Sequence, residues 1–225
     1  MADFWLELLL SLAVVGLFLS FLAWLNRKGY AQNLACLEKI AKSEGLQVYH
    51  SPIGGSLWRR APYEAEYLGA TGQYAYLRGG WHGFDLQLKS IRRRGRPFAT
   101  RLSLRWVENI ENMGGTLLLC PKGSAARYKT DALQAVDLVG VLSQDFELLS
   151  DQPQWALSLL NSRTAEYLYQ QKAYLRGPLC LSPQLLYSEE ADLILNPPQL
   201  EAVQARLKIL AQLAQYFGLK ARHAA

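Results

Sequence analysis

The chain has 225 residues and a formal net charge of +5, with 50% hydrophobic and 19% charged residues. This composition excludes a disordered chain and a fibrous low-complexity protein, and three scattered cysteines exclude a disulfide framework. The length fits one domain with an appendage. The apolar residues are concentrated near the N-terminus, where an uncharged run of 18 residues extends from Leu8 to Leu25.

This run predicts a transmembrane helix. At a rise of 1.5 Å per residue it spans most of a bilayer core about 30 Å thick. The residues typical of the two membrane interfaces flank it: Trp5, Trp24, Arg27 and Lys28. A cleaved signal peptide would begin with basic residues and have a shorter apolar core. We therefore predict a retained anchor over residues 1–28 and a soluble domain over residues 29–225.

The charges beside the run predict its orientation. No lysine or arginine precedes it, whereas Arg27, Lys28, Lys39 and Lys42 follow it. Because basic residues stay on the cytoplasmic side, we expect a single-pass signal-anchor protein of the bacterial inner (plasma) membrane. Its N-terminus would lie outside and its domain in the cytoplasm, a compartment in which the free cysteines would remain reduced.

A helical pattern resumes at Tyr30 and reaches Gly45, after Gly29 has interrupted or bent the anchor helix. Residues 46–121 then alternate between polar and apolar side chains, which predicts antiparallel strands, separated by glycine pairs such as Gly79-Gly80. The predicted strands are Pro62–Gly69, Gln73–Leu77, Phe84–Leu88, Phe98–Trp106 and Thr116–Cys120. Residues 84–106 form a predicted hairpin with a basic tip.

The second half of the chain mixes helices and strands. A strand at Asp145–Leu149 leads into a helix capped by Ser150 or Asp151, with Pro153 in its first turn. The remaining predicted segments are a helix over Thr164–Tyr174 and short strands at Leu179–Leu181, Leu185–Tyr187 and Leu193–Leu195, with turns at Pro183 and Glu189-Glu190.

A long amphipathic helix closes the pattern. Asn196 caps it, Pro197 occupies its first turn, and an apolar stripe runs from Leu200 to Phe217 before Gly218. The predicted fold is therefore an α+β domain with a mostly antiparallel sheet and a long C-terminal helix, joined to one transmembrane helix.

Charge divides the soluble part. Residues 29–130 contain 15 basic and 7 acidic side chains, and residues 131–201 contain 3 basic and 10 acidic ones. A cluster of seven cations without an acid lies on the predicted hairpin: Lys89, Arg92, Arg93, Arg94, Arg96, Arg101 and Arg105. It is interpreted either as a solvated tip that protects an edge strand or as a binding surface for anionic lipid headgroups or an acidic partner. No stacking module accompanies it, so nucleic acid is not the expected partner.

No catalytic, cofactor or metal-binding signature occurs in the sequence. His82 and Asp85 could form a proton-transfer pair, but no nucleophile or metal-ligand pattern accompanies them, and an exposed turn histidine is the simpler reading. The acidic stretch at Glu189, Glu190 and Asp192 is read as a turn of solvated carboxylates rather than a cation site. We expect no enzyme, no cofactor and no metal.

The order of elements resembles a group of bacterial single-pass membrane-anchored proteins with an α+β cytoplasmic domain, to which no activity is assigned. The stretches that carry this resemblance are Tyr67–Trp106, Asp145–Leu160 and Leu179–Phe217. The retained anchor, the lack of catalytic motifs and the two oppositely charged parts of the soluble domain predict a non-enzymatic accessory or scaffold protein. It would dock on an integral membrane complex or on its own copy. The alternatives are an anionic-lipid-binding module that uses the basic tip, and an enzyme centred on His82 and Asp85.

Overall fold

The computed structural model describes residues 2–49, 76–92, 98–106, 114–128, 131–191, 194 and 196–219. Their strands form one nine-stranded sheet in the order β1-β2-β3-β4-β9-β8-β5-β7-β6, and every pairing is antiparallel. The strands are β1 Gln47–Tyr49, β2 Tyr76–Trp81, β3 Phe84–Arg92, β4 Phe98–Arg105, β5 Leu117–Pro121, β6 Gln134–Val136, β7 Phe146–Ser150, β8 Leu179–Ser182 and β9 Leu185–Ala191. The predicted α+β class with a mainly antiparallel sheet is confirmed.

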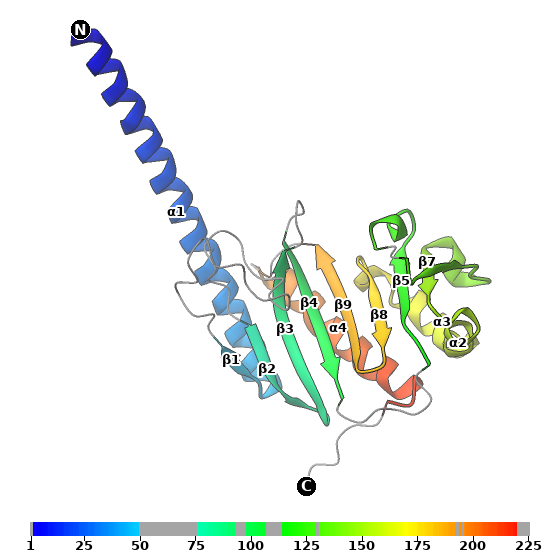
Figure 1. Cartoon of the computed structure of the whole chain (residues 1–225). Helices are drawn as coiled ribbons and strands as arrows, with labels where there is room; N and C mark the ends of the chain where they lie inside the picture. Colours follow the sequence, from blue (N-terminus) through cyan, green and yellow to red (C-terminus); the bar gives the residue numbers. More distant parts are fainter. Residues whose placement is uncertain are drawn as a thin grey trace.

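Helices cover one face of this sheet (Figure 1). The α-helices are α1 Ala2–Glu44, α2 Pro153–Leu159, α3 Ser162–Gln170 and α4 Pro197–Tyr216, and short 3-10 turns lie at Ala125–Arg127, Val141–Gln144 and Lys172–Tyr174. Helix α4 crosses behind β4, β9 and β8, and the C-terminal part of α1 lies beside β1 and β2 (Figure 1). The main core lies between these helices and the inner face of the sheet.

The predicted hairpin of residues 84–106 is confirmed by the pairing of β3 with β4. Alternation divides its side chains between the two faces. Leu86 faces Leu104 and Leu88 faces Leu102 on the inner face, where all four are buried. The polar residues between them therefore lie on the outer face. Residues 93–97, the predicted tip, lie outside the described residues, as do the predicted strand at Pro62–Gly69 and most of that at Leu193–Leu195.

The β2–β3 turn differs from the prediction. Gly79 and Gly80 lie inside β2 instead of separating two strands, and the turn is made by His82 and Gly83. Both turn residues have positive φ, +49° and +81°, as in the two-residue turns that match the twist of a hairpin. At Gly79 the reason for glycine is packing, because an added Cβ would lie 3.0 Å from the Leu46 side chain. The close approach of β2 to Leu46, just after α1, thus favours a glycine within the strand.

Two helix starts follow side-chain caps. Asn196 accepts a hydrogen bond from the Gln199 backbone at 3.1 Å, which confirms the predicted start of α4. Asn161 caps α3 in the same way, through the Thr164 backbone at 3.1 Å, so α3 begins earlier than predicted. The predicted cap of α2 is wrong: Asp151 instead accepts a hydrogen bond from the Thr116 backbone, which ties the α2 entry to the start of β5.

Helix α1 continues without a break through Gly29 for 43 residues, so the predicted interruption at that glycine is wrong. Its two parts have opposite surroundings. Leu37 and Ile40 are 2% and 0% exposed in the core, whereas every side chain described from Leu9 to Leu25 is exposed. The N-terminal part projects away from the sheet (Figure 1). Among the described residues, no helix combines the length and the apolar character that crossing a membrane requires.

The buried part of α1 makes the first testable prediction. We expect Ile40→Ala to lower the free energy of unfolding by about 2–5 kcal/mol, because it opens a cavity beneath a fully buried side chain. Leu17→Ala in the same helix should change it by less than about 0.5 kcal/mol, since Leu17 is 72% exposed. Urea unfolding followed by tryptophan fluorescence measures both. Equal effects would show that the C-terminal part of α1 is not integral to the core.

Candidate functional site

The exposed part of α1 is the first candidate interface. Twelve large apolar side chains between Leu9 and Leu25 are exposed, from Leu22 at 39% to Leu17 at 72%. Phe21 and Trp24 stack at a centroid distance of 6.0 Å near its end. The exposed Lys28 follows, with Nζ 5.3 Å from the centroid of the Trp24 ring. The side chains of Trp5 and Arg27, the other predicted interface residues, lie outside the described part of the chain.

The described members of the predicted basic cluster are distributed along both strands of the hairpin. Lys89 lies near one end of β3, directly across from Arg101, while Arg105 is exposed at the far end of β4, across from Asp85. Arg92 is the last residue of β3. Arg93, Arg94 and Arg96 are outside the described residues. The structure therefore does not gather all seven cations at one tip, because β4 carries Arg101 and Arg105 back toward the β2–β3 turn.

Arg101, one of the predicted lipid- or partner-binding residues, forms an ion pair within the sheet. Its Nε and Nη2 atoms donate to Oε1 of Glu189 at 2.8 and 2.6 Å. The two side chains are only 13% and 4% exposed, and the guanidinium lies 4.5 Å from the centroid of the Tyr187 ring. β9 continues through Glu189 and Glu190, so the predicted turn of solvated carboxylates is wrong. The antiparallel β4–β9 register places Glu189 across from Arg101.

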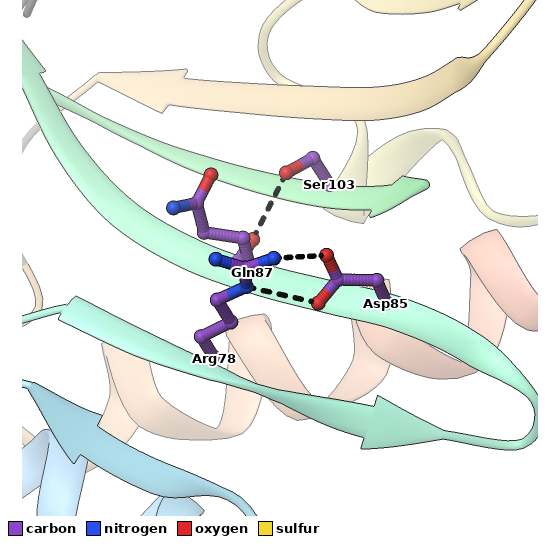
Figure 2. Close-up of polar contacts among 4 residues, drawn as sticks. All are labelled: Arg78, Asp85, Gln87 and Ser103. Atoms are coloured by element: carbon purple, nitrogen blue, oxygen red, sulfur yellow. Dashed lines mark hydrogen bonds and ion pairs between the residues drawn. The ribbon is translucent and has the colours of Figure 1, made fainter. Parts of the chain in front are cut away.

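A second ion pair lies on the open outer face. Arg78 donates from Nη2 and Nε to the Asp85 carboxylate at 2.9 and 3.3 Å, across the β2–β3 pairing (Figure 2). Beside it, the Ser103 hydroxyl donates to the Gln87 carbonyl at 3.1 Å (Figure 2). Asp85 is thus paired with Arg78 of the neighbouring strand, whereas the enzyme hypothesis required it to be paired with His82. The His82 ring packs edge-on against Trp81 at 4.4 Å.

Sequence reasoning missed a buried ion pair on the inner face. Arg206 of α4 is 2% exposed, and its Nη2 lies 3.0 Å from Oε2 of Glu190, which is 20% exposed. Among the described residues, Nε and Nη1 of Arg206 find no hydrogen-bond partner. Burial lowers the pKa of Arg206, and the Glu190 carboxylate opposes that shift. A signal was present, because Arg206 follows Val203 by three residues and precedes Leu210 by four, on the apolar stripe of α4.

A smaller apolar cluster covers the outer face where β5, β7 and β8 meet. It is built on Leu118, Cys120, Leu149 and Cys180, with the partly buried Tyr187 packed against it. The three cysteines of the chain form no disulfide and are buried. Desolvation raises the pKa of the Tyr187 hydroxyl, and the neighbouring Cys180 adds to this, while Arg101 lowers it.

Tyr187 makes a pH-dependent prediction. In the unfolded chain a tyrosine loses its proton near pH 10, whereas the raised pKa keeps Tyr187 protonated in the folded protein. The contribution of Tyr187 to the free energy of unfolding is therefore fully present below pH 10 and decreases as the pH rises above 10. Between pH 8 and 10.5, wild type should lose up to about 1 kcal/mol more unfolding free energy than Tyr187→Phe. Parallel pH profiles of the two proteins would refute this.

These observations define an α+β protein in which helices cover one face of an antiparallel sheet and a long helix projects from it. The sequence matches no family model and no curated protein. The fold is similar to that in the crystal structure of the mycobacterial trehalose monomycolate transport factor A, TtfA, with a TM-score of 0.55. The two sequences are 13% identical, and the match covers 81% of this chain and 94% of that one. This likeness shows a shared fold.

Proposed function

We propose that this chain is a non-enzymatic, membrane-anchored accessory or scaffold protein that docks on an integral membrane complex. In this proposal the N-terminal part of α1 spans the inner (plasma) membrane, with the N-terminus outside and the domain in the cytoplasm. The observation that carries it is the exposed apolar part of α1, which continues as the same helix into the core of the domain.

The distribution of the exposed side chains favours a bilayer as their surroundings. Leu17, Phe18 and Leu19 are consecutive and point about 100° apart around the helix, and all three are more than half exposed. A protein partner that packs on one side would leave the others in water. Burying one such side chain stabilises by about 1.5–3 kcal/mol, so twelve of them strongly favour an apolar medium on every side.

The scaffold role rests on three supports. Helix α1 joins the proposed anchor to the domain without a loop, so the domain would be held in a fixed place beside the membrane. Cations on the outer face, such as Arg105, offer an acidic partner complementary charge. The neighbour in fold is described as a transport factor, which fits a protein that assists a membrane complex.

Purification of the full chain in mild detergent at native expression tests this function. We expect it to elute as a defined complex with a reproducible integral membrane protein, identified by mass spectrometry. Two differently tagged copies of the chain, expressed together, distinguish self-association from docking on another protein. The variant Arg105→Glu, which reverses a charge offered to an acidic partner, should weaken the complex without changing membrane association. Recovery of a dispersed monomer alone would overturn the scaffold proposal.

A further inference from the structure

The C-terminal end of α1 is fixed beside the β2–β3 turn. Trp81 at the end of β2 donates its indole N–H to Oε2 of Glu44 at 3.0 Å, and Leu46 packs against Gly79. From this common point, α1 and β3 extend to the same side of the domain (Figure 1). Positions along the helix and the strand can therefore be compared by counting residues from the contact.

The count places the far end of β3 level with the end of the apolar run of α1. From Glu44 back to Lys28 the helix rises about 24 Å, at 1.5 Å per residue. From Phe84, which faces Trp81, to Arg92 the strand rises about 26 Å, at about 3.3 Å per residue. Arg92 thus lies near the height of Lys28, the residue that follows Trp24 and Leu25. Arg105 and Gln184 lie at the opposite end of the sheet.

The side chains near this height are those typical of a membrane interface. Lys28 is exposed on α1, and Lys89 lies three residues before Arg92 on β3. Tyr49 and Tyr76 face each other at the same end of β1 and β2, where their rings stack at 5.3 Å and Tyr49 is 39% exposed. Tyrosine, lysine and arginine favour the headgroup region, where apolar rings and charged groups are both accommodated.

We infer that this end of the sheet, defined by Tyr49, Tyr76, Lys89 and the end of the β3 backbone at residue 92, rests on the headgroups of the leaflet that α1 enters. Its ligand is an anionic phospholipid surface. The inference rests on the proposed anchor and adds the contact that fixes how the domain faces the membrane. Each lysine or arginine held close to an anionic leaflet strengthens association about fivefold, within roughly one Debye length of about 8 Å.

Lipid-quenched fluorescence of the full chain in nanodiscs tests this placement. One variant carries a fluorophore at Ala99→Cys, beside the proposed contact, and its matched control carries it at Gln184→Cys, in the β8–β9 turn. The native cysteines are buried, at 8% exposure or less, and unlabelled wild type serves as the background. With a quencher on the lipid headgroup, we expect strong quenching at position 99 and little at position 184.

Two failures are distinguishable. If the full chain does not incorporate into nanodiscs, both the anchor and this inference are overturned. If it incorporates but the two positions are quenched equally, or position 184 more strongly, only the inference is overturned.

A charge-matched pair of variants tests the headgroup chemistry. In nanodiscs that contain phosphatidylglycerol, Lys28→Gln/Arg92→Gln should reduce the quenching at position 99. Arg163→Gln/Lys208→Gln removes the same charge from exposed positions on α3 and α4, away from the proposed contact, and should leave the quenching unchanged. In phosphatidylcholine nanodiscs the two double variants should behave alike. Equal effects of both variants in the anionic nanodiscs, or a contact that forms only when a protein partner is added, would overturn the lipid assignment.

Discussion

Replacing Glu190 with alanine is expected to destabilise the domain by about 3–5 kcal/mol, because it leaves the Arg206 guanidinium buried without a counter-charge. Arg206 is 2% exposed, and two of its nitrogens already have no partner among the described residues. Glu190 is therefore the group that makes this buried cation tolerable. Chemical denaturation of the full chain in detergent, followed by the fluorescence of the buried Trp81 and Trp106, measures the loss.

The reverse substitution should be much milder. In Arg206→Met the remaining Glu190 carboxylate is 20% exposed and can be hydrated, so we expect a cost of at most about 1–2 kcal/mol. The double variant Glu190→Leu/Arg206→Met should be close to wild type, because it replaces a buried pair by packed apolar groups. A double-mutant cycle isolates the coupling between the two residues. Equal costs for the two single variants would contradict this account of the pair.

Arginines placed in the exposed part of α1 are expected to release the protein from membranes. At the centre of a spanning helix each arginine costs about 2.5–3.5 kcal/mol of insertion free energy, so Val14→Arg/Leu17→Arg adds about 5–7 kcal/mol. Both positions are exposed in the structure, at 58% and 72%, and neither contacts the core. The fraction of the chain that sediments with carbonate-washed membranes measures the effect.

Matched controls separate insertion from folding. Val14→Ala/Leu17→Ala should remain in the membrane fraction, and Gln32→Arg, on the exposed side of α1 beyond the apolar run, should do so too. Retention of the double-arginine variant in washed membranes would contradict the proposed anchor.

The sequence predicted those strands and helix starts that depend on residues close together in the chain. The alternation in β3 and β4 and the Asn196 cap of α4 were readable because strand faces and helix starts depend on neighbours in sequence. The strand order could not be read in the same way. β9 pairs with β4, more than 80 residues earlier in the chain, and that pairing keeps Glu189 and Glu190 extended where acidic composition alone indicates a turn.

The candidate site was predictable in its residue types and only partly in its geometry. The apolar run and the cations were visible in the sequence. Which cations remain at a surface depends on pairing across strands, and the β4–β9 register commits Arg101 to Glu189. The burial of Arg206 was not predicted for a related reason. A single charged residue on an apolar stripe indicates a buried ion pair only once its partner on the sheet, here Glu190, is known.

The central claim is that α1 spans the membrane and places the domain in the cytoplasm. Reporter fusions at Ala225 test it directly: alkaline phosphatase is active only outside the cytoplasm, and a fluorescent protein that folds only in the cytoplasm reports the other side. The account predicts a fluorescent fusion in washed membranes and an inactive phosphatase. Active phosphatase with a dark fluorescent fusion, or a fluorescent fusion recovered free of membranes, would contradict it.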